Sequence, residues 1–136
     1  MKKVSQFLLL ALLLAVGILL DLAPIQVPDG VDKVYHFFGF ALITFFAINT
    51  FVSHYGKKSL DSFLMFLLTF GSVFAGISEF LQKFVSVREC DPVDWLTNLF
   101  GITLVVAITY FMNSKQHRDA ELNESQFDFK DLPVLS

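Results

Sequence analysis

Residues 79–101, EFLQKFVSVRECDPVDWLTNLFG, join two apolar segments through a short polar connection. Polar side chains lie inside or beside both segments: Glu79, Gln82, Arg88, Asp91, Asp94 and Asn98. Ionisable groups are costly in apolar segments and usually serve a function there. The stretch therefore predicts a polar site at the ends of two apolar helices.

The same stretch predicts how these two helices are connected. Asp91-Pro92-Val93-Asp94 has the features of a helix start, with an acid at the N-cap, proline at the first helical position and a second acid two residues later. Few residues separate the apolar segment at about 60–85 from the one at 91–112. We therefore expect a tight antiparallel helical hairpin.

Two further apolar segments precede the hairpin. Residues 4–20 are charge-free after two lysines, and residues 32–52 are rich in phenylalanine. About 20 apolar residues span a bilayer, so residues 4–20 are predicted to be a first transmembrane helix. A basic start before a leucine-rich segment is also typical of a cleaved signal peptide, and that alternative stays open.

The composition is that of a membrane protein. Of 136 residues, 54% are hydrophobic and only 17% are charged. We predict an all-α, polytopic membrane protein with four transmembrane helices, or three if the first segment is cleaved. The helical domain covers residues 1–112, and residues 113–136 are predicted to be a polar, acidic and mostly disordered cytoplasmic tail.

The charges predict an orientation and exclude some partners. Most basic residues flank one side of the predicted helices: Lys2, Lys3, Lys57, Lys58, Lys115 and Arg118. The positive-inside rule makes that side cytoplasmic, so the C-terminus is cytoplasmic and the polar site faces away from the cytoplasm. A net charge of −3 argues against nucleic acid as a partner. Cys90 is the only cysteine, which excludes an internal disulfide and a cysteine-clustered metal site.

This topology brings distant polar residues to one level of the membrane. The candidate binding residues are Asp32, Lys33, His36, Glu79, Gln82, Arg88, Asp91, Asp94 and Asn98. Helical spacing groups Ser72, Gly76, Glu79 and Lys83 on one face, Asp94, Asn98 and Gly101 on a second, and His36, Gly39 and Ala47 near one another on a third. Glycines below the polar residues should let the helices approach and enclose a small pocket. The alternative is structural, with the polar residues only clamping the hairpin and capping helix ends.

Two blocks carry a family resemblance. They are Asp32-Lys33-x-x-His36-Phe37-x-x-Phe40 and Glu79-x-x-Gln82-x5-Arg88-x2-Asp91-x2-Asp94-x3-Asn98-x2-Gly101. In this order the blocks resemble the VanZ-like family of small multi-pass membrane proteins. The resemblance implies a family named for an accessory protein of glycopeptide resistance, whose mechanism is not established. The chain departs from the commoner pattern at Val105, where a second glycine often stands, and in its long acidic tail.

Three functions fit these residues. The favoured one is a non-enzymatic membrane factor that binds a lipid headgroup, an envelope precursor or a partner protein, with Arg88 and Lys33 holding an anionic group. The second is an intramembrane enzyme with His36 and Glu79 as acid and base on a lipid-linked substrate, although no familiar catalytic motif is present. The third is a small proton-coupled transporter, for which the chain would form homo-oligomers. No metal or cofactor is predicted.

Overall fold

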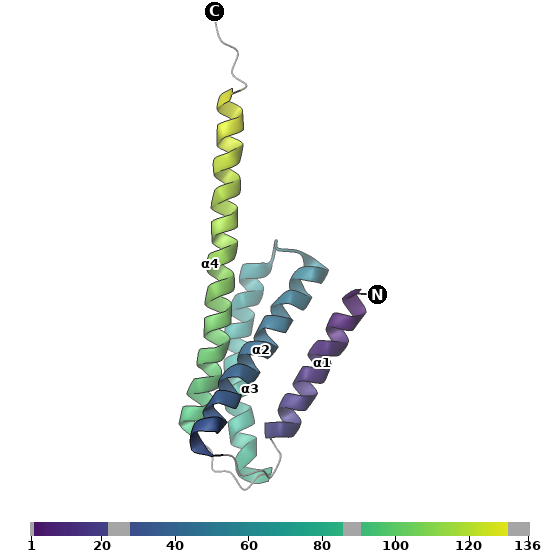
Figure 1. Ribbon diagram of the computed structural model, residues 1–136, viewed down its shortest axis with the longest axis vertical. Helices are drawn as coiled ribbons and strands as arrows, with labels where there is room; N and C mark the ends of the chain where they lie inside the picture. Colours follow the sequence, from purple (N-terminus) through teal and green to yellow (C-terminus); the bar gives the residue numbers. More distant parts are fainter. Residues whose placement is uncertain (1, 22–27, 86–90, 131–136) are drawn as a thin grey trace, which may run out of the picture. The chain divides into compact units, whose positions relative to one another are not determined.

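The computed structural model describes residues 2–21, 28–85 and 91–130, and these form four α-helices (Figure 1). The helices are α1 (Lys2–Asp21), α2 (Asp29–Tyr55), α3 (Leu60–Val85) and α4 (Pro92–Lys130). Each apolar segment of the sequence corresponds to one helix. The predicted all-α class and the four helices are therefore confirmed.

The fourth helix is longer than the sequence analysis predicted. It was expected to end near Met112, with a mostly disordered tail after it, whereas residues 113–130 continue α4. The predicted end of this helix was wrong, because it was placed from apolar periodicity alone. Between Asn113 and Lys130 the chain has no glycine or proline and many good helix formers, which favour a helix without an apolar face.

The chain divides into two units, Met1–Val106 and Ala107–Ser136. The first holds α1, α2, α3 and the first part of α4, and the described part of the second is the rest of α4. The candidate site lies entirely in the first unit.

Antiparallel contacts order the first three helices (Figure 1). Near the start of α1, Gln6 accepts a 2.6 Å hydrogen bond from Ser53, close to the end of α2. Near the end of α1, Gly17 lies against Ile43. Phe51 of α2 stacks on Phe63 of α3 with ring centroids 4.0 Å apart, just across the turn that joins these two helices. Neighbouring helices among these three therefore run in opposite directions.

By contrast, α2 and α4 run in the same direction at close range. A Cβ atom on Gly101 would lie 2.5 Å from the carbonyl oxygen of Phe37 and 3.2 Å from the amide nitrogen of Ala41. Only glycine fits where two backbones come this close. The expectation that a glycine below the polar residues lets helices approach is met at Gly101, and the contact places the starts of α2 and α4 side by side.

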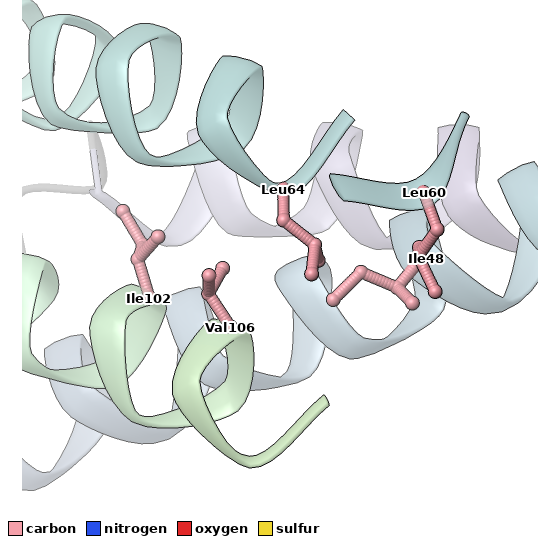
Figure 2. Packing of buried hydrophobic residues seen from close by; sticks show 5 residues of the cluster. All are labelled: Ile48, Leu60, Leu64, Ile102 and Val106. Atoms are coloured by element: carbon pink, nitrogen blue, oxygen red, sulfur yellow. The ribbon is translucent and has the colours of Figure 1, made fainter. Parts of the chain in front are cut away.

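The interior of the first unit is apolar toward one end. Five side chains from α2, α3 and α4 form a buried apolar core, and Figure 2 shows them reaching toward one another: Ile48, Leu60, Leu64, Ile102 and Val106. This core lies near the turn between α2 and α3. The other end of the same helices is occupied by polar side chains.

Up to about Met112, the outside of the described helices is largely apolar. Three segments are long and apolar enough to cross a membrane: Gly30–Tyr55, Leu60–Phe84 and Pro92–Asn123. Large side chains such as Phe66, Phe70 and Phe84 are more than half exposed. Exposed apolar surface on this scale is unusual for a soluble monomer and compatible with an integral membrane protein. The apolar part of α1, Val4–Leu19, is shorter than these three segments.

Candidate functional site

Polar side chains from three helices meet at the end of the first unit where α2 and α4 begin. We call this group the polar cluster, and direct contacts connect its members: Asp32, Lys33, His36, Glu79, Asp91, Asp94 and Asn98. His36, Glu79, Asp94 and Asn98 are each at most 5% exposed. Seven of the nine predicted binding residues therefore lie together, as the helix order and spacing predicted.

Lys33 connects the starts of α2 and α4. Its Nζ donates to Oδ2 of Asp91 at 2.8 Å and to Oδ1 of Asp94 at 2.9 Å. The Asp91 side chain is 39% exposed and that of Asp94 is 6% exposed, so one ammonium group bridges a solvated and a buried carboxylate. Lys33 was predicted to bind an anionic ligand. In the structure it forms hydrogen bonds with two carboxylates of the same chain.

Asp91 has a second role at the start of α4. Its Oδ1 accepts a 2.9 Å hydrogen bond from the amide of Val93, which makes it the N-cap that the sequence predicted. The hydrogen bond from Lys33 and then the one from Val93 lower the pKa of the Asp91 carboxyl below its usual value. Asp91 therefore stays ionised, and its charge faces the positive end of the helix.

His36 lies among three carboxylates. Its Nε2 is 3.7 Å from Oδ1 of Asp32 and 3.8 Å from Oδ2 of Asp94, and its Nδ1 is 3.7 Å from Oε1 of Glu79. These distances are longer than hydrogen bonds. The imidazole thus has a carboxylate near each ring nitrogen, with one acid from each of α2, α3 and α4.

Glu79 and Asn98 connect α3 to α4. The Asn98 amide donates to Oε1 of Glu79 at 3.2 Å, and Asn98 is completely buried. Gln82, one turn further along α3, is only 1% exposed. The face predicted for α3 is corrected at one position, because Lys83 is exposed while Gln82 is buried.

Two other expectations have different outcomes. Arg88 was predicted to bind an anion or to pair with Glu79, and it lies outside the described residues. Gly39 was grouped with His36 on one face of α2, but it is exposed and a Cβ atom there would meet nothing within 4 Å. Among the glycines in the described residues, it is Gly101 whose position lies against the backbone of α2.

Trp95 borders the polar cluster and was not among the predicted site residues. Its indole Nε1–H donates to the carbonyl oxygen of Ser72 at 3.2 Å, and its ring lies against the position of Gly76. The signal in the sequence was the pair of small residues Ser72 and Gly76, one turn apart on α3, which could have indicated a place for a bulky side chain. Small residues on one helix leave room for a large ring on the next.

The chemistry of the polar cluster is mainly anionic. Its described members carry four carboxyl groups, on Asp32, Glu79, Asp91 and Asp94, and one lysine. Asp32, His36 and Asp94 also offer donor atoms that lie within 4.8 Å of one another, so these three residues could hold a metal ion. No metal was predicted from the sequence, because the chain has no cysteine cluster and no helical metalloprotease spacing. The three residues of this group come from two different helices, so their spacing in the sequence does not reveal them.

Comparison with known proteins adds no relative: no protein-family model, curated protein or solved structure matches the chain. The VanZ-like resemblance of the two sequence blocks stays a prediction.

Proposed function

We propose that this chain is a VanZ-like integral membrane protein that uses the polar cluster to bind the phosphate-bearing headgroup of a membrane lipid or of a lipid-linked envelope precursor. One observation carries the proposal: ionisable and amide side chains from three helices are buried together inside helices whose outer surface is apolar. Buried charges of this kind are costly in a membrane and usually belong to a binding or transport site. A lipid headgroup lies at the depth of helix ends.

Spectroscopy of Trp95 tests this function directly. Trp95 is the only tryptophan and follows Asp94, so its fluorescence reports on the polar cluster. Adding short-chain phosphatidylglycerol or a polyprenyl phosphate to the detergent-purified protein should give a saturable change. Lys33→Gln removes the cationic side chain of the described cluster and should weaken the apparent affinity by about tenfold, which corresponds to about 1.4 kcal/mol.

Lys83→Gln is the matched control, because it makes the same change at an exposed position near the end of α3. This variant should bind as the unchanged protein does. The proposal fails if folded protein shows no saturable response to either lipid, or if folded Lys33→Gln binds both lipids as tightly as the unchanged protein does.

The proposed orientation puts the polar cluster on the non-cytoplasmic side and the C-terminus in the cytoplasm, following the distribution of lysine and arginine. Cys90 precedes Asp91 and is the only thiol, so it can be labelled selectively. A membrane-impermeant maleimide should react with Cys90 in intact cells. Reaction only after the cytoplasmic side is opened would reverse the orientation.

An enzymatic function is the second candidate, because His36 has carboxylates near both ring nitrogens. Such an arrangement can hold an imidazole in one orientation and tune it as an acid or base. On this alternative, His36→Ala abolishes turnover of a lipid-linked substrate and leaves the protein folded. Headgroup binding without turnover favours the first proposal.

A further inference from the structure

The polar cluster has a charge imbalance that a phosphate ligand would worsen. Among the described residues, the cluster holds four carboxyl groups and one lysine, and that lysine already bonds to Asp91 and Asp94. Negative charges in a buried site need a nearby positive charge. A cation at this place would balance the carboxylates and attract a phosphate oxygen.

Three donor atoms of the cluster surround a common point. Nε2 of His36 lies 3.7 Å from Oδ1 of Asp32 and 3.8 Å from Oδ2 of Asp94, and all three atoms are within 4.8 Å of one another. Donors bound at about 2.0 to 2.2 Å to one transition-metal ion stand roughly 3 to 4 Å apart. The spacing is too long for direct hydrogen bonds and close to that of donors sharing an ion.

The surroundings of these donors suit a metal site. Lys33 bonds to Oδ1 of Asp94 and leaves Oδ2 on the side of His36. Oε1 of Glu79 lies 3.7 Å from Nδ1 of His36, the ring nitrogen opposite the one at the site. A carboxylate behind a metal-binding histidine orients the ring and makes it a better donor.

The close packing of α2 and α4 makes the donor set rigid. Asp32 and His36 are one turn apart on α2, and Asp94 comes from α4. The approach of Gly101 to the backbone of Phe37 fixes these two helices next to His36, which precedes Phe37. The ligands therefore do not depend on a flexible loop.

We propose that Asp32, His36 and Asp94 bind one divalent transition-metal ion, such as Zn²⁺ or Mn²⁺, and leave an open coordination position for an oxygen ligand. One imidazole with two carboxylates is a donor set that such ions accept, and three protein ligands leave room for a further ligand. The metal site stands on these three donors, whereas its role toward a phosphate headgroup rests on the function proposed above.

Metal titration of the full chain tests this inference. The detergent-purified protein, stripped with EDTA, is titrated with Zn²⁺ and separately with Mn²⁺ by calorimetry. We expect one ion per chain for at least one metal, with affinity lowered about tenfold or more in Asp32→Asn and in His36→Gln. The same metal should raise the melting temperature of the unchanged protein, because it binds the folded state.

Two surface variants serve as matched controls. His117→Gln and Asp119→Asn change the same residue types at exposed positions of α4, and both should bind metal like the unchanged protein. Circular dichroism establishes that each variant is folded. Asp32 is the most exposed of the three ligands, at 17% for the side chain, so Asp32→Asn is the variant that best preserves the fold.

The outcomes separate the metal site from the proposed function. Absence of one-to-one binding of either metal to folded protein overturns the metal site, and so does equal affinity in a folded Asp32→Asn variant. If EDTA leaves lipid binding unchanged, the headgroup function is supported and the metal has no role in it. If the protein binds metal but gives no response to lipid, the metal site is supported and the headgroup function is wrong.

Discussion

The polar cluster and the buried apolar core occupy different levels of the same three helices and are held together by different forces. At the core, Ile48, Leu60, Leu64, Ile102 and Val106 touch through dispersion contacts alone. At the polar cluster, hydrogen bonds and ion pairs join fixed atoms. In a bilayer, lipid tails are as apolar as leucine, so burying the core yields no hydrophobic gain between helices. If the helices lie in a membrane, as proposed, we expect the polar end to set which helices pair and in which register.

The largest expected effect comes from Gly101, which separates the two regions. In Gly101→Ala the new methyl would overlap the carbonyl oxygen of Phe37, and backbone cannot rotate away as a side chain can. We expect α2 and α4 to move apart and the protein to lose about 3 kcal/mol or more of stability. Thermal unfolding in detergent measures this. Gly39→Ala is the control, with open space around it, and equal effects of both changes would contradict the proposed contact.

The second prediction compares two carboxylates that share one lysine. Asp94→Asn removes a buried charge and should destabilise the protein by about 1–3 kcal/mol, measured with EDTA present so that no metal contributes. Asp91→Asn changes the same group at an exposed position, and asparagine also caps helices, so its effect should be clearly smaller. If the two variants unfold at the same temperature, burial of a carboxylate does not decide how much it stabilises the polar cluster.

The smallest change is expected in the apolar core. Leu64 is 2% exposed, and Leu64→Ala removes dispersion contacts with its neighbours. In water such a change costs about 2–5 kcal/mol, but without a hydrophobic term the loss should be about 1–2 kcal/mol. The same unfolding assay measures it. A loss larger than that of Asp94→Asn would mean that the core, and not the polar end, dominates stability.

The sequence predicted most of the fold because its signals were local. Apolar length defined the four helices, and Asp91-Pro92 marked the start of α4. The end of α4 was missed because residues 113–130 are helical by intrinsic propensity, which apolar periodicity does not detect. The all-α class could therefore be predicted from local sequence signals. Insertion of each helix in a membrane is part of the proposed function.

The site was predictable as a set of residues but not as a set of contacts. Antiparallel order and short connections brought His36, Glu79 and Asp94 to one level. Spacing along one helix could not reveal that Lys33 bonds to two acids of α4, or that Nε2 of His36 lies between Asp32 and Asp94. Those facts depend on the rotation of α2 against α4, which the contact at Gly101 fixes.

The pairing of Lys33 also bears on how the chain is made. Its two carboxylate partners follow 58 and 61 residues later, at the beginning of the last helix. When helices enter a membrane in the order of synthesis, α2 arrives with an ammonium group whose acids have not yet left the ribosome. The ion pairs of Lys33 can therefore form only after the start of α4 has been synthesised.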